Sequence, residues 1–345
     1  MNNPSGKTSV RLPALDLARC IAMVMMILGH SFFEFVNPKN IDMDIFPWDF
    51  WTFLRGVTAP VFLMISGAVN VFANKRQSDG SLSKETIMRR LKLASFLIMV
   101  GYLFVFPADK FYHIFFIESK FWIPFFQVNI LQLIGVSLLM LLVLFLLTKN
   151  DKSLGIISFI IAVIITALTP VVLSIDWFYI LPDFFASYLS LNNGTIFPIF
   201  PFSSFLFYGV TLGVLLKNVS IDKRNSAILK FSIPISAIFL VFGIPIYFLF
   251  NEYNTYQFVD LLKANPGILL IRAGIVMFGL PIIMMFYYKT KQWAYYYTLL
   301  GKNALWIYVI HLVILYGTPW FPGITAALKQ KSDIDISFIL SITIV

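Results

Sequence analysis

Residues 14–36 read ALDLARCIAMVMMILGHSFFEFV, an apolar run broken by only a few polar side chains. A helix of about 20 apolar residues crosses the ~30 Å hydrocarbon core of a bilayer. Similar runs recur along the 345-residue chain, which is 59% hydrophobic and 12% charged. Soluble proteins carry about 25% charged residues, and a water-soluble chain of this length needs a charged surface. The sequence therefore predicts an integral membrane protein.

The apolar runs predict an all-α fold, a polytopic membrane bundle of about ten transmembrane helices. The last run stops at Val345 after about ten residues, too few to span, so we expect that helix to be truncated or partly inserted. We expect residues 1–345 to form a single integral membrane domain without a soluble domain. The predicted helices cover residues 14–36, 50–73, 91–108, 129–148, 154–174, 199–216, 231–250, 268–288, 294–316 and 336 onward.

The distribution of basic residues predicts a cytoplasmic N-terminus. Cytoplasmic loops of membrane proteins are enriched in Lys and Arg. Basic residues cluster at Lys7 and Arg11 and in segments 74–92, 217–230 and 289–291, which all fall on one side if the chain begins inside. The opposite loops carry mostly acidic residues, from Asp42 to Asp260. We expect a multi-pass protein of a bacterial-type cytoplasmic (inner) membrane.

The same loops account for the net charge of +9, so we expect no nucleic-acid partner. No secretory cleavage site follows the N-terminus, and the first helix is expected to be retained. Cys20 is the single cysteine, which excludes an intrachain disulfide. The external segments 109–128 and 175–198 are rich in aromatic residues. They fit either an interfacial belt or the rim of an acceptor-binding site.

The first predicted helix carries four ionisable residues on one face: Asp16, Arg19, His30 and Glu34. At ~100° per residue, Arg19 and His30 lie only about 20° apart around the axis. Asp16 then lies about 60° from Arg19, and Glu34 about 40° from His30. Arg19 and His30 are separated by roughly 16 Å along the axis. Ionisable residues inside a membrane helix are expensive and usually functional.

This stripe suggests a division of labour. Arg19, near the cytoplasmic end, can pair with Asp16 or bind the phosphates of an anionic cofactor. His30, in the outer half, can act as a general base, and Glu34 can orient its imidazole. The structural alternative is an Asp16–Arg19 pair at the membrane face with a histidine that is hydrogen-bonded inside the bundle.

The second predicted helix repeats the eleven-residue spacing with Arg55 and Ser66, and Asn70 follows one turn later. These three are candidate substrate-binding residues. Small residues such as Ser66 also permit close helix packing, and Arg55 can snorkel to the interface. Both readings remain open.

Three further polar residues are candidates for substrate binding: Gln132, Arg272 and His311. Gln132 can line an acceptor pocket or hydrogen-bond across helices, and Arg272 can balance Glu34 or an anionic ligand. For His311, packing and chemistry are equally compatible with the sequence. The chain has no HExxH or CxxC motif, and its histidines are scattered, so we expect no metal site. It also lacks GxxxxGK[ST] and GxGxxG motifs, which argues against an ATP-driven machine.

Five segments resemble the transmembrane acyltransferase superfamily. RLPALDLARCIAMVMMILGH (11–30) resembles the first helix of the superfamily, and its Arg19 and His30 fit the R-x10-H pattern of the acyltransferase-3 branch. APVFLMISG (59–67) resembles the FFxxSG segment of the second helix in that branch. NILQLIGVSLL (129–139), FPIFPFSSFLFYGVTLG (197–213) and GKNALWIYVIH (301–311) resemble the heparan-α-glucosaminide N-acetyltransferase catalytic-domain branch. Two positions depart from the pattern: Cys20 replaces a small residue, and Leu133 replaces an arginine.

The resemblance implies a bundle of ten or eleven helices that moves an acyl group, usually acetyl, from cytoplasmic acyl-CoA to an external sugar hydroxyl or amine. It places the CoA at Arg19 and the base or transient acyl carrier at His30. The expected partners are the lipid bilayer, acetyl-CoA and a carbohydrate or cell-envelope glycan, and the oligomeric state stays open. The alternative is a proton-coupled permease or exporter in which the same stripe is a proton relay.

Overall fold

The computed structural model describes residues 12–108, 110–220, 223–252 and 264–345. Lys7, Arg11 and Asp260, which entered the topology prediction, lie outside these residues. The α-helices are α1 (Pro13–Phe35), α2 (Trp48–Ala73), α3 (Lys84–Phe104), α4 (Trp122–Phe126), α5 (Ile130–Leu147), α6 (Asp151–Ser174), α7 (Asp183–Ala186), α8 (Ile199–Lys217), α9 (Arg224–Glu252), α11 (Pro266–Lys289), α12 (Ala294–Tyr316), α13 (Thr325–Leu328) and α14 (Ile334–Ile344). Short 3-10 helices cover Pro38–Asn40, Phe111–Phe116, Ser119–Phe121, Trp177–Tyr179 and Lys291–Trp293.

The all-α membrane fold predicted from the sequence is confirmed. Within the described residues, eight helices are long and apolar enough to cross a membrane. The described β structure is a two-residue antiparallel pair, β1 (Gly317–Thr318) with β2 (Phe321–Pro322). The first two predicted helices begin within two residues of α1 and α2, and the predicted 294–316 coincides with α12. The prediction of about ten spans is therefore two higher than the number of helices that qualify.

The two helices that fall short do so for different reasons. The helix predicted at 91–108 begins at Lys84, where the Ser83 side chain caps it by accepting a hydrogen bond from the Thr86 amide. The first half of α3 is therefore charged, and Arg89 and Arg90 lie on a helix rather than in a loop. The last predicted helix is present as α14, which is 11 residues long.

The helix predicted at 231–250 also starts earlier, at Arg224. The Arg224 side chain donates hydrogen bonds to the carbonyl oxygens of Lys217 and Val219, the segment that ends α8. Arg224 therefore stabilises the connection between α8 and α9. Hydrophobic periodicity does not predict this role, because it depends on side-chain hydrogen bonds.

A cluster of charged side chains ties one end of the bundle together. Asp151, in the first turn of α6, pairs with Arg76 after α2 at 3.2 Å and with Lys217 at the end of α8 at 2.6 Å. Arg76 also donates hydrogen bonds to the carbonyl and the hydroxyl oxygens of Thr148. The structure thus gathers basic residues from separate loops at one end. Placement of that end in the cytoplasm remains a prediction from the charge distribution.

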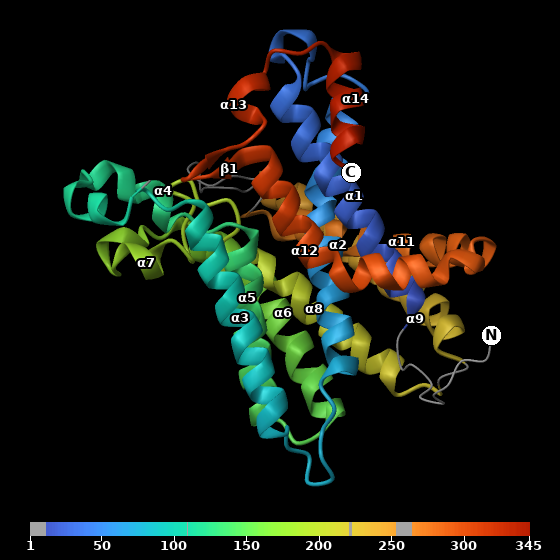
Figure 1. Cartoon of the computed structure of the whole chain (residues 1–345). Coiled ribbons are helices and arrows are strands. Elements are labelled where there is room, and N and C mark those ends of the chain that lie inside the picture. The colour runs from blue at the N-terminus through green and yellow to red at the C-terminus, as the bar shows by residue number, and fades with distance from the viewer. Residues whose placement is uncertain (1–11, 109, 221–222, 253–263) are drawn as a thin grey trace, which may run out of the picture.

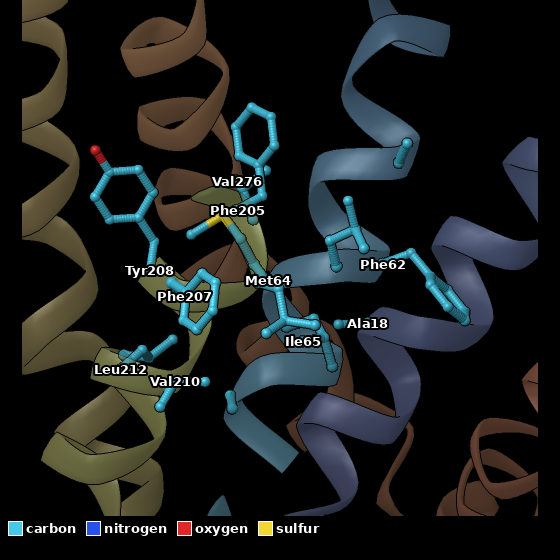
Figure 2. Packing of buried hydrophobic residues seen from close by; sticks show 14 of the residues in the cluster. Ala18, Phe62, Met64, Ile65, Phe205, Phe207, Tyr208, Val210, Leu212 and Val276 are labelled. Carbon is cyan, nitrogen blue, oxygen red and sulfur yellow. The ribbon is translucent and has the colours of Figure 1, made fainter. Parts of the chain in front are cut away.

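The centre of the bundle is the contact between α2 and α8. Figure 2 shows Met64 of α2 beside Phe205 and Phe207 of α8. Glycines allow the two backbones to meet, because a Cβ at Gly67 or Gly209 would overlap the carbonyl oxygen of the facing helix, Leu206 or Met64. Small residues at such crossings are typical of membrane helix packing.

The helices α2, α12 and α14 pack against α1 (Figure 1). After α12 the chain turns through β1, β2 and α13 and reaches the C-terminal end of α1 before α14 begins. We call residues 317–333 the strap. The amide of Ser332 donates to the Phe35 carbonyl, and the amide of Asn37 donates to the Ser332 carbonyl. The strap therefore fixes the end of α1 that carries His30 and Glu34.

The close α2–α8 contact predicts that a methyl group added at this crossing lowers the free energy of unfolding, whereas one added at an open position does not. Gly209→Ala places Cβ against the Met64 backbone, which has no freedom to give way, so we expect a loss of at least ~1–3 kcal/mol. Gly279→Ala is the matched control, because its Cβ would have nothing within 4 Å and Ala favours helix over Gly. Thermal unfolding in detergent measures both. Equal melting temperatures for the two variants would contradict the packing described.

Candidate functional site

The two eleven-residue spacings found in the sequence meet in space. Because α1 and α2 run antiparallel, Ser66 faces Arg19 and Arg55 faces Gly29, the residue before His30. The Arg19 guanidinium donates to the Ser66 hydroxyl at 3.2 Å. The Arg55 Cγ atom lies 3.3 Å from where a Cβ on Gly29 would be. Polar residues from two helices therefore form two clusters, one at each end of the α1 stripe.

The inner cluster consists of Asp16, Arg19, Ser66 and Asn70. Asp16 is buried, and α12 crosses α1 directly over it, with Gly301 leaving no room for a side chain. The Asn70 amide donates to the Ser66 carbonyl at 2.9 Å, while its own Oδ1 is buried and accepts no hydrogen bond from a described residue. These groups offer a guanidinium and an amide in a confined space, which suits an anionic ligand.

The outer cluster is built on a pair of histidines. His30 Nδ1 lies 3.3 Å from His311 Nε2, and the two rings are stacked with centroids 5.6 Å apart. Tyr308 and Tyr316 present their rings edge-on to His30 at 6.4 and 6.5 Å. His311 is 2% exposed, so this neighbour holds the His30 imidazole from inside the bundle. Two of the scattered histidines of the sequence thus act together.

Glu34 takes a position that differs from the one expected. It accepts a hydrogen bond from the Tyr316 hydroxyl at 3.3 Å and lies 3.8 Å from Lys329 of the strap. Among the described residues it is His311 rather than Glu34 that hydrogen-bonds to His30. The rotation of about 40° between His30 and Glu34 around α1 directs the carboxylate to the end of α12 instead.

Two arginines border the outer cluster on its α2 and α11 sides. The Arg55 guanidinium lies over the Phe33 ring at 4.1 Å. It also interacts electrostatically with His30, Glu34 and Tyr316. Arg272 is 8% exposed, and its guanidinium occupies the space that a side chain at Gly56 would need. Arg55 therefore belongs to the region of His30, and Arg272 contacts the next residue along α2, Gly56.

Gln132 lies apart from both clusters. Its side-chain oxygen accepts a hydrogen bond from the Asn129 amide and so caps the start of α5. The side chain is fully buried against Gly101 of α3. The structure does not bring it together with the stripe on α1.

Sequence reasoning missed the parts of the site that the strap and the end of α12 supply. Tyr316 is about 140° around the helix from His311, so helical periodicity does not link the two. Lys329 lies in a loop whose approach to α1 only tertiary structure decides. Tyr308 was the one signal available, since it precedes His311 by a single turn.

The arrangement offers an imidazole, guanidinium groups and hydroxyl donors at one end, with a separate cluster around Arg19 about 16 Å away along α1. Within the part of the chain described, no group of three or more His, Cys, Asp or Glu residues is placed to hold a metal ion. These groups suit proton transfer and binding of negative charge.

The chain matches the family model described as heparan-alpha-glucosaminide N-acetyltransferase, catalytic, over residues 11–251. This match spans more than half of the 345 residues, and the chain therefore belongs to this family of membrane acetyltransferases. No curated protein matches the chain. His311 lies beyond the matched residues, and the structure alone joins it to His30.

The histidine pair predicts a specific cross-link between α1 and α12. In a Cys20→Ser background, we expect the His30→Cys and His311→Cys pair to react with a short bis-methanethiosulfonate, because their side chains face each other. The control pairs His30→Cys with Trp306→Cys, since Trp306 is on α12 but is 53% exposed. Intramolecular bridging is read by mass spectrometry. Bridging in the control pair alone would refute the placement of α12.

Proposed function

We propose that this family member is an integral membrane acetyltransferase of a bacterial-type cytoplasmic membrane. It transfers the acetyl group of cytoplasmic acetyl-CoA to a sugar hydroxyl or amine of a carbohydrate or cell-envelope glycan. The contact between His30 and His311 is the observation on which the proposal rests, because it provides a held imidazole base at the outer end of the stripe. The family membership supports the same chemistry.

The inner cluster is the proposed contact for the donor. Arg19 provides charge-assisted hydrogen bonds to phosphate oxygens of CoA, and the Ser66 hydroxyl accepts a hydrogen bond from that guanidinium. Asn70 has a buried oxygen available to a ligand donor. A phosphopantetheine arm then covers the ~16 Å along α1 and brings the thioester to His30.

The outer cluster is the proposed place of reaction. His30 takes the proton of the acceptor hydroxyl or amine while the acceptor lone pair forms the new bond to the thioester carbonyl carbon. The tetrahedral intermediate then breaks its C–S bond. The CoA thiolate leaves and receives the proton from His30, which returns the imidazole to its neutral form.

His311 is the proposed positioning residue for this base. In the proposed mechanism His30 Nδ1 is the donor to His311 Nε2, which leaves the lone pair on His30 Nε2. Among the described residues no partner occupies that Nε2, so it is available to the acceptor. Glu34 supports the arrangement through Tyr316, which contacts His30. Arg272 is the proposed contact for the acceptor, and Arg55 borders the reacting groups from α2. A role for Gln132 in substrate binding stays a prediction, because its side chain is buried between α3 and α5.

A proton-coupled permease would use the same polar stripe as a relay. The family match does not favour this alternative, since the family is one of acetyltransferases.

If His30 is the general base, its removal should greatly slow acetyl transfer but leave acetyl-CoA binding intact. We expect His30→Ala to lower acetyl transfer by about 10²–10⁴-fold, the usual contribution of a general base, while acetyl-CoA still binds. Radiolabelled acetyl-CoA and purified protein in detergent measure binding and turnover together. Full activity of a folded His30→Ala protein would overturn the mechanism.

The donor site predicts the opposite pattern for Arg19. We expect Arg19→Ala to raise the Kd for acetyl-CoA about 10–100-fold, because a charge-assisted hydrogen bond contributes about 1.5–3 kcal/mol. Arg89→Ala is the control, since Arg89 is an exposed arginine on α3. An unchanged Kd in the folded Arg19→Ala protein would remove Arg19 from the donor site.

A further inference from the structure

Transfer from a thioester develops negative charge on the carbonyl oxygen when the acceptor attacks. In a site with little water, fixed hydrogen-bond donors that point to this oxygen are usually the largest source of rate enhancement. Backbone amides commonly provide them, but those around His30 lie within α1 and are used in its own hydrogen bonds. The site therefore needs a side-chain donor.

Arg55 has the position for this task. Its side chain lies along α1, with Cγ, Cδ and Nε against the bare backbone at Gly29 and the guanidinium carbon 4.1 Å from the ring centre of Phe33; these two residues lie on either side of His30 in sequence. The side chain is half-buried and interacts electrostatically with His30. Its stacking on a ring leaves the N–H edge of the planar group directed away from the ring.

The Arg55 donors are also uncommitted. Within the described residues the guanidinium makes no hydrogen bond and no ion pair, and its contact is the ring of Phe33. Two other donors on this side of the site are already engaged. The Tyr316 hydroxyl donates to Glu34, and Lys329 lies beside the same carboxylate with its side chain 61% exposed.

We propose that Arg55 is a catalytic residue that donates N–H hydrogen bonds to the thioester carbonyl oxygen and stabilises the oxyanion. The acceptor lone pair forms a bond to the carbonyl carbon, the carbonyl π electrons move to the oxygen beside Arg55, and His30 takes the acceptor proton. On collapse the oxygen reforms the carbonyl, and the C–S electrons leave with the CoA sulfur. This role rests on the proposed acetyl transfer.

The test uses hydroxylamine, a small uncharged acceptor, so that any effect on binding of an anionic acceptor is removed. We expect Arg55→Met to lower kcat for acetyl transfer from acetyl-CoA to hydroxylamine by about 10²–10³-fold, after subtraction of the uncatalysed rate. The Kd for acetyl-CoA should stay within a few fold of the wild-type value. Arg55→Lys should restore part of the rate, and the exposed Arg89→Met should leave it unchanged.

A second variant perturbs the position of Arg55 without removing its charge. Gly29→Val inserts a side chain where Arg55 now lies, with the nearest Arg55 atoms 3.3–3.4 Å from Cβ alone. We expect a clear fall in kcat with the Kd for acetyl-CoA retained. If Arg55→Met does not fold, Gly29→Val and Arg55→Lys decide the question in the same assay.

Wild-type kcat in folded Arg55→Met would overturn the oxyanion role and leave the proposed function intact. A fall in transfer to a sugar acceptor with no fall for hydroxylamine would also overturn it, because Arg55 would then bind the acceptor. A folded wild-type protein that neither binds nor turns over acetyl-CoA would overturn both the proposed function and this role.

Discussion

The polar stripe on α1 lies in a bundle that offers little water, and so its ionisable side chains favour partners on neighbouring elements. This constraint organises the molecule. Arg19 donates to Ser66 of α2, His30 contacts His311 of α12, and Glu34 accepts from Tyr316 at the end of α12. The helices that surround α1 are therefore the ones that satisfy its polar face, and the candidate site is the set of contacts that results.

Glycine determines how closely those partners approach. At Gly67 and Gly209 the missing side chain lets α2 and α8 meet backbone to backbone and forms the rigid centre of the bundle. At Gly29 and Gly56 the missing side chain leaves space for a guanidinium instead, Arg55 in one case and Arg272 in the other. The same property thus serves packing in the core and positions charge beside His30.

The separation of the two clusters follows from the length of a helix. Eleven residues of α1 place Arg19 and His30 roughly 16 Å apart, and the antiparallel α2 reproduces the same spacing in reverse. A donor with a charged head and a long flexible arm fits such a site, because its two ends differ in chemistry and are separated by that arm. The strap binds the outer end of α1 through the backbone of Glu34, Phe35 and Asn37 and leads directly into α14.

The sequence by itself determined the membrane fold, because hydropathy and length specify where a helix can span, and it determined that Asp16, Arg19, His30 and Glu34 share a face, because helical geometry is local. It also indicated Arg55, Ser66 and Arg272 as residues near that face. Only the tertiary structure decided that His311 contacts His30 and that Tyr316 and Lys329 contact Glu34. It also decided that Gln132 is buried against α3, away from the polar face of α1. The contacts of His30 and Glu34 join residues 281 to 295 positions apart, and they depend on how α12 and the strap pack against α1, which no local pattern in the chain encodes.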